Sequence, residues 1–132
     1  MRTRILIGAL VVSAIFSLGV GATRADVAGN RQWSVVNFPD AVLVKDTFVM
    51  GSVLIVHDGE KMARGEPCTT FYRFEPGKGP QEAIVSFHCK PVKRTAASTT
   101  QFTYSTAGSI GCKRQVEYQI GGDAEAHGVP TK

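Results

Sequence analysis

The stretch CTTFYRFEPGKGPQEAIVSFHC, residues 68–89, decides the fold of this chain. Two runs rich in Phe, Tyr, Val and Ile flank a segment of Pro and Gly, a pattern typical of two antiparallel strands joined by a turn. With the turn centred in this segment, Cys68 faces Cys89, Thr70 faces Phe87, and the apolar sides of the two strands coincide. The stretch therefore predicts a β-hairpin with a cysteine at the open end of each strand.

Similar runs of β-branched and aromatic residues continue on both sides of this hairpin, separated by Gly, Pro and Asp. We expect further strands at residues 31–36, 41–45, 48–50, 53–57, 99–105 and 112–120. Residues 60–67 are polar and include Gly65 and Pro67, so we expect a loop there. The sequence thus predicts an all-β fold, a small antiparallel sandwich or partly closed barrel of about seven or eight strands.

The last of these strands has the clearest pattern. Its apolar face is formed by every second residue, namely Cys112, Arg114, Val116, Tyr118 and Ile120, and polar residues lie between them. Such alternation indicates an antiparallel strand with one buried face. The residues that follow, 121–132, are polar and rich in Gly, and we expect them to form a flexible tail.

The first 25 residues have the composition of a secretory signal peptide. Two arginines precede an apolar run at residues 5–20, and small residues follow it. Because this run is too short to span a bilayer, we expect cleavage after Ala22 or Ala25 and no membrane span in the mature chain. A single domain, residues 26–120, would then function in a periplasmic or extracellular space.

The charge balance argues against a nucleic-acid partner. Of the 15 basic residues, Arg2, Arg4 and Arg24 lie in the expected signal peptide, whereas all 11 acidic residues follow it. The mature chain is therefore nearly neutral, and nucleic-acid binding requires a clustered basic surface. The sequence identifies no other partner class, and an envelope protein or a small ligand remain open.

Three cysteines in an exported chain predict a disulfide bond, because thiols rarely stay reduced in an oxidising compartment. The hairpin register favours a bond between Cys68 and Cys89. Cys112 stays open as an alternative partner, because a direct cross-strand bond requires a particular pair geometry. If Cys112 is unpaired, its place on an apolar strand face indicates a buried, inert thiol.

The histidines and cysteines are also ligand types for copper, zinc or haem iron. Adjacent strand residues point to opposite faces, so His88 and Cys89 do not easily bind one ion, and bridged sulfurs are poor ligands. A metal or haem site that uses His57 and His88, with a cysteine or Asp58, is therefore the second hypothesis. The sequence has no GxSxG, CxxC or phosphate-loop motif, and we expect no enzymatic activity.

Two segments, VLIVHDGEKMARGEPCTTFYRF at 53–74 and AIVSFHC at 83–89, resemble a group of small, uncharacterised secreted bacterial proteins. That group carries an HD dipeptide, a GEPC segment and an SFHC strand. The resemblance implies an exported β-rich domain and a distinctive residue set, namely His57, Asp58, Glu66, Cys68, His88 and Cys89. It implies no activity.

Together these observations predict an exported, non-catalytic β-domain that binds a partner or acts as a scaffold at the cell envelope. A disulfide between Cys68 and Cys89 would stabilise it. The candidate binding residues are His57, Asp58, Glu66 and His88.

Overall fold

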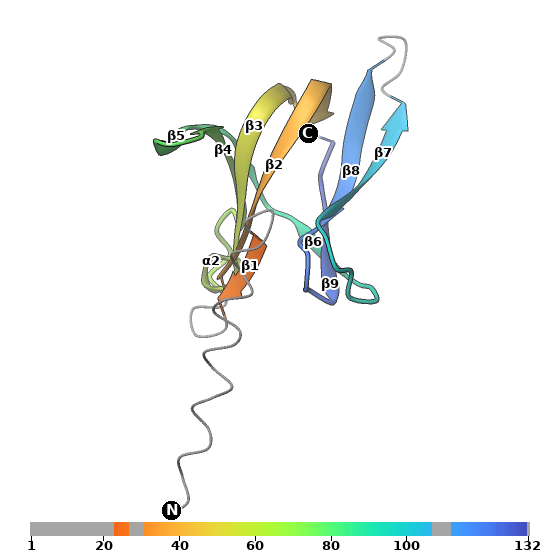
Figure 1. Cartoon of the computed structure of the whole chain (residues 1–132). Coiled ribbons are helices and arrows are strands. Elements are labelled where there is room, and N and C mark those ends of the chain that lie inside the picture. The colour runs from red at the N-terminus through yellow and green to blue at the C-terminus, as the bar shows by residue number, and fades with distance from the viewer. Residues whose placement is uncertain (1–22, 27–30, 107–111, 132) are drawn as a thin grey trace, which may run out of the picture.

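A computed structural model of the chain describes residues 23–26, 31–106 and 112–131 (Figure 1). The expected signal peptide lies outside these ranges up to Ala22. The elements are β1 (Thr23–Asp26), β2 (Arg31–Val44), β3 (Thr47–Asp58), α2 (Gly59–Ala63), β4 (Thr69–Glu75), β5 (Gly79–Phe87), β6 (Lys90–Lys93), β7 (Gln101–Thr106), β8 (Lys113–Gln119) and β9 (Glu125–Gly128). The predicted all-β class is confirmed. Within the described ranges, no helix is long and apolar enough to cross a membrane.

The strands form one mixed sheet that is not closed into a barrel. Its order is β5-β4-β3-β2-β8-β9-β6, with β1 beside β2 and β7 beside β8. Among these pairs only β2 and β8 are parallel, and their ladder joins Val42 to Lys113 and Leu43 to Arg114. Figure 1 shows the result: β2–β5 form one half of the molecule, β6–β9 form the other, and the two halves face each other.

Strand β2 is continuous where two strands were predicted with a break at Pro39-Asp40. The register with β3 shifts between Phe38 and Val42, which is a β-bulge. Proline has no N–H to donate to a ladder, so a bulge is the place where a strand accommodates it. Opposite the bulge, Gly51 has a φ of 87°, in the left-handed region that favours glycine. The predicted strands 48–50 and 53–57 likewise join into β3.

The predicted hairpin forms as β4 and β5, but its register differs from the prediction by one residue. Thr69 pairs with Phe87 and Phe71 pairs with Val85, so Phe71 rather than Tyr72 points into the core. Irregularities after Phe71 and Tyr72 shift the pairing again towards the turn. Because a one-residue slip exchanges the two faces of a strand, the predicted apolar face was wrong for β4.

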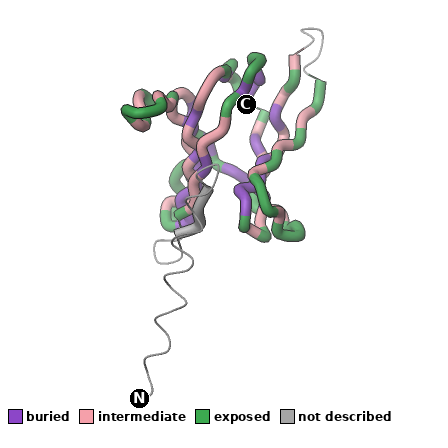
Figure 2. The backbone as a smooth tube through the Cα atoms, viewed as in Figure 1, coloured by how far each residue is buried: buried purple, intermediate pink, exposed green. Residues whose placement is uncertain are grey.

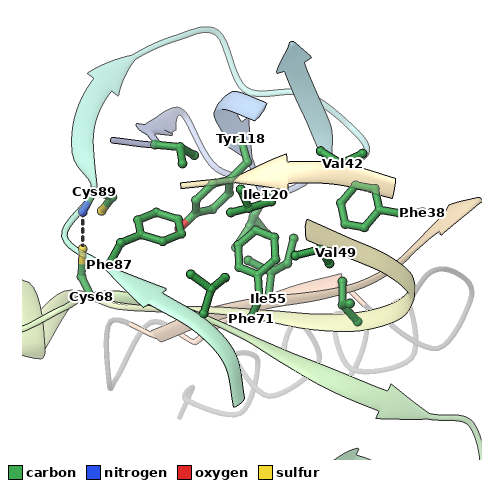
Figure 3. Packing of buried hydrophobic residues seen from close by; sticks show 14 residues of the cluster. Phe38, Val42, Val49, Ile55, Cys68, Phe71, Phe87, Cys89, Tyr118 and Ile120 are labelled. Atoms are coloured by element: carbon green, nitrogen blue, oxygen red, sulfur yellow. Dashed lines mark hydrogen bonds between the residues drawn. The ribbon is translucent and has the colours of Figure 1, made fainter. Parts of the chain in front are cut away.

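The core lies between the two halves of the sheet. Phe71, Ile55 and Phe87 reach it from one half, and Tyr118 and Ile120 reach it from the other (Figure 3). The ring of Phe71 meets that of Tyr118 edge-on, with centroids 6.2 Å apart. Figure 2 shows that buried residues lie along the strands of both halves and that exposed residues gather at the hairpin ends.

The predicted alternation of the last strand breaks inside β8. Thr103 pairs with Glu117 and Tyr104 pairs with Gln115, which leaves Val116 out of the ladder between β7 and β8 as a bulge. Gln115 is buried as a result, although the pattern predicted a polar face there. Cys112 is partly exposed, so the prediction of a buried thiol was wrong.

Two segments predicted without regular structure contain short elements. Residues 60–67 were predicted as a loop, but Gly59–Ala63 form the helix α2. The prediction of a flexible tail at 121–132 was wrong for the described residues, because β9 pairs with both β6 and β8. Ala126 and His127 of β9 are fully buried. A strand that is covered on both sides shows no alternation of apolar and polar residues. Because the prediction of strands relied on such alternation, it missed β9.

Candidate functional site

A buried cluster of sulfur and imidazole groups lies where the chain crosses from one half of the sheet to the other. The ligand atoms of His57, Cys68 and Cys89 all lie within 4.8 Å of one another. His57 comes from the end of β3, Cys68 directly precedes β4, and Cys89 follows β5. A fourth side chain, His127 of β9, contacts two of them. The exposed fractions of these residues are 3% for His57, 3% for Cys68, 8% for Cys89 and 0% for His127.

The ladder between β3 and β4 positions His57. Its backbone pairs with Thr69, and the next residue, Asp58, donates its backbone N–H to the carbonyl oxygen of Cys68 at 2.9 Å. Both ring nitrogens of His57 are buried without a hydrogen-bond partner. Burial lowers the pKa of His57, against the opposing charges of Asp123 and Asp58. The ring is therefore neutral near pH 7 and can offer a nitrogen lone pair.

His127 stacks on His57. The ring centroids are 3.9 Å apart and the planes are inclined by 25°. Its Nδ1 lies 3.7 Å from Sγ of Cys89, and its Nε2 lies 3.6 Å from Oδ2 of Asp123. Burial, together with the neighbouring His57, lowers the pKa of His127 to about 4. Two neutral imidazoles do not repel each other, so the stack is stable without a counter-ion.

Cys68 and Cys89 approach to 2.6 Å without a bond between them. The backbone N–H of Cys89 donates to Sγ of Cys68 at 3.2 Å, as Figure 3 shows. Burial, with the hydrogen bond to Cys68, raises the pKa of Cys89 to about 12, so this thiol keeps its proton at neutral pH unless a bound cation displaces that proton. The disulfide between these two cysteines stays a prediction, and the structure places them within reach of it.

Tyr118 forms one wall of the cluster. Its ring lies 5.1 Å from that of His127, and its hydroxyl is hydrogen-bonded to the hydroxyl of Thr69. Burial raises the pKa of Tyr118. Tyr118 is thus a neutral, fixed ring that excludes water from the cluster.

Asp58 and Glu66, which the sequence singled out, have other partners. Asp58 is the N-cap of α2, and its Oδ1 accepts hydrogen bonds from the backbone N–H groups of Glu60 at 3.0 Å and Lys61 at 3.3 Å. Burial of Asp58 opposes these hydrogen bonds, but they and Arg31 together lower its pKa. Glu66 is exposed and forms an ion pair with Arg64 at 3.1 Å.

The predicted pair of His57 and His88 is not brought together. His88 is exposed in the link between β5 and β6, although its neighbours Phe87 and Cys89 are buried, whereas His57 is buried. His127 occupies the place that the sequence analysis gave to His88. It was missed because it lies in the segment predicted as a flexible tail, and the only signal for it was its residue type.

The chain has been compared with protein-family models, with curated proteins and with solved structures, and no match was found.

Proposed function

We propose that this chain is an exported, non-catalytic β-domain that binds one transition-metal ion through His57, Cys68 and Cys89. The observation that carries the proposal is the convergence of three buried ligand atoms within 4.8 Å. The unpaired nitrogens of His57 add to it. A buried polar group without a hydrogen bond costs about 1–3 kcal/mol, and a bond from one nitrogen to a metal ion would remove part of that cost.

The chemistry of the ligands narrows the class of ion. Thiolate sulfur and imidazole nitrogen are the ligands of zinc and copper, whereas magnesium and calcium take oxygen ligands. Three ligand atoms that lie within 4.8 Å of one another fit a single ion. The cluster is buried, and catalytic metal sites keep a position open for water or substrate, so this one supports binding rather than catalysis.

Metal analysis of the untagged protein, purified from the periplasm under reducing conditions, tests this function. We expect about one zinc or copper ion per chain, in line with one closed set of ligands. The variants His57→Ala and Cys89→Ser should lose the ion. His88→Ala is the matched control, because it removes an exposed histidine outside the cluster. A reduced wild-type protein that carries no metal and takes up none on titration would contradict the proposal.

A second candidate function is favoured by the 2.6 Å approach of Cys68 to Cys89. In an oxidising compartment the two thiols would form a disulfide, and the domain would serve as a covalently tethered scaffold. Closing a loop of this length is worth roughly 3 kcal/mol of stability in the chain-entropy model. Counting the free thiols of the denatured, unreduced protein separates the two candidates. A count of one free thiol, that of Cys112, supports the disulfide-bonded scaffold, and a count of three free thiols supports the metal site.

Export and location at the cell envelope rest on the composition of residues 1–25 and on the resemblance carried by residues 53–74 and 83–89. Sequencing the N-terminus of the mature protein tests both. A start at Thr23 or Asp26 is expected. Cleavage after Ala22 would leave β1 complete beside β2, whereas cleavage after Ala25 would leave only Asp26 of it.

A further inference from the structure

We propose that His127 is the fourth ligand of this metal site, that the ion is divalent with zinc as the preferred metal, and that the ion fastens β9 to the rest of the fold. This inference rests on the proposed function, because it assumes that His57, Cys68 and Cys89 bind a metal ion. It adds a ligand from the opposite half of the sheet and assigns the charge of the ion.

His127 lies close to the cysteine beside it. Nδ1 of His127 lies 3.7 Å from Sγ of Cys89. In a tetrahedral zinc site with a Zn–S bond of about 2.3 Å and a Zn–N bond of about 2.0 Å, a sulfur and a nitrogen ligand lie roughly 3.6 Å apart. His127 therefore already occupies the distance from Cys89 that a shared ion requires.

The ring of His127 has a nitrogen that no hydrogen bond satisfies. His127 is fully buried, and its Nε2 has no hydrogen-bond partner. Asp123 lies 3.6 Å from that nitrogen, beyond a good hydrogen bond, yet close enough to accept one after a small rotation of the ring. A carboxylate that accepts a hydrogen bond from the far nitrogen of a histidine is the usual outer partner of a histidine ligand.

The charges of a buried site must balance for the site to be stable. Two thiolates and two neutral imidazoles with a divalent ion have no net charge. A monovalent ion such as Cu(I) would leave a buried charge of about −1, which costs free energy in a medium of low dielectric constant. Asp58 and Asp123, both of which act electrostatically on His57, would increase that cost. The surroundings therefore favour a divalent ion.

Binding changes the cluster in two ways that can be measured. The two thiol groups each lose a proton to the solvent, so one ion binds and about two protons are released. Cys68 and Cys89 move apart from 2.6 Å, because two sulfur ligands of a tetrahedral zinc ion lie roughly 3.8 Å apart. The ring of His127 also turns out of its stack on His57, because two parallel rings do not direct their lone pairs at one point.

The consequence for the fold follows from where the four ligands lie. His57 and Cys68 belong to the half of the sheet that contains β3, β4 and β5, Cys89 lies in the crossing between β5 and β6, and His127 belongs to β9. The ladder from β9 to β8 consists of only two residue pairs, Glu117 with Gly128 and Tyr118 with His127. An ion shared by these ligands would therefore join β9 directly to the opposite half.

Titration of the reduced, full-length mature chain with Co(II) and then Zn(II) tests the inference, using the visible spectrum of cobalt as the readout of coordination. The wild type should bind one Co(II) with the intense bands of a tetrahedral site containing thiolates, and Zn(II) should displace it. His127→Gln should weaken zinc binding by more than about 100-fold, beyond the loss expected for an outer partner, and should change the cobalt spectrum. His127→Cys should restore a tetrahedral spectrum, because cysteine is a ligand and glutamine, although closer to histidine in size, is not.

The outcomes separate this inference from the proposed function. A His127→Gln chain that binds Co(II) with the wild-type spectrum and affinity would overturn the fourth ligand while leaving the metal site intact. A wild type that takes up Cu(I) but neither Zn(II) nor Co(II) would overturn the divalent assignment. A wild type that binds none of these ions would overturn the proposed function itself. His88→Ala should behave as the wild type throughout.

Discussion

At the scale of single residues, the stacked histidines carry the clearest physical signature. His57 and His127 are buried as neutral rings, and burial is the main cause that lowers the pKa of each. In the unfolded chain both titrate near 6.5. The folded, metal-free protein therefore binds fewer protons than the unfolded chain below that pH.

The stability of the metal-free, reduced protein should consequently fall as the pH drops from 6.5 towards about 4, the pKa of His127. The loss should be about 1.4 kcal/mol per pH unit for each histidine that gains a proton on unfolding. Urea unfolding at several pH values between 7 and 5 measures this slope. His88→Ala should keep the slope, and a flat profile would show that the two rings are not buried as described.

Asp58 provides a prediction that separates a helix cap from a metal ligand. Replacing Asp58 by Ala removes the acceptor for the backbone N–H groups of Glu60 and Lys61, and should cost about 1 kcal/mol of stability. Asp58→Asn should cost less, because asparagine is also a good N-cap. Thermal unfolding measures both variants. Neither should change the metal content, and loss of the ion in Asp58→Asn would make Asp58 part of the site.

At the scale of elements, the strand β9 decides whether the cluster is complete. Ending the chain after Ile120 removes Ala126, His127 and Val129 from the core. The truncated protein should lose more than about 3 kcal/mol of stability, because several buried side chains are lost at once. Denaturant unfolding measures the loss, and deletion of Thr131 and Lys132 is the control, because Thr131 is exposed. Unchanged stability after the first truncation would show that the residues after Ile120 form a flexible tail that does not contribute to the core.

The strands that could be predicted from the sequence are those marked by a pattern within their own residues. Apolar alternation and the Pro-Gly turn at 75–80 predicted the hairpin of β4 and β5, and its two cysteines drew attention to the site. The register was missed because bulges near Phe71 and Val116 depend on how strands fit their neighbours, which local alternation does not encode. His127 was missed because a short strand of polar and small residues becomes buried only through contacts with distant elements.

At the scale of the whole molecule, the state of one pair of sulfur atoms distinguishes two forms of the protein, a metal-binding form and a disulfide-bonded form. Cys68 and Cys89 are either thiolate ligands of an ion or the two halves of a disulfide, and they are not both at once. Exchange with a small disulfide such as oxidised glutathione would convert two protein thiols into one disulfide and release two glutathione thiols.

Oxidised chains should therefore retain one free thiol, that of Cys112, and should take up no metal. Reduction with a dithiol should restore both the thiols and metal binding. A zinc-loaded chain should react more slowly than the metal-free chain, because its sulfurs are coordinated. Thiol titration with parallel metal analysis measures both states. Undiminished metal binding by the fully oxidised chain would place the ion elsewhere.

The sequence also predicted the overall class, since runs of β-branched residues without a helical period indicate an all-β domain. The predicted sandwich also has two facing layers, but the sequence did not predict that both would belong to one mixed sheet joined by the short parallel ladder between β2 and β8. That arrangement depends on the bulge between Phe38 and Val42 and on the crossing from β5 to β6, and it is what brings His57 and His127 together.

X-ray absorption spectroscopy of the zinc-loaded, reduced mature chain tests most directly whether one ion joins these halves. We expect two sulfur ligands at about 2.3 Å and two nitrogen ligands at about 2.0 Å from the zinc ion. A first shell made only of oxygen and nitrogen, with no sulfur, would contradict this expectation.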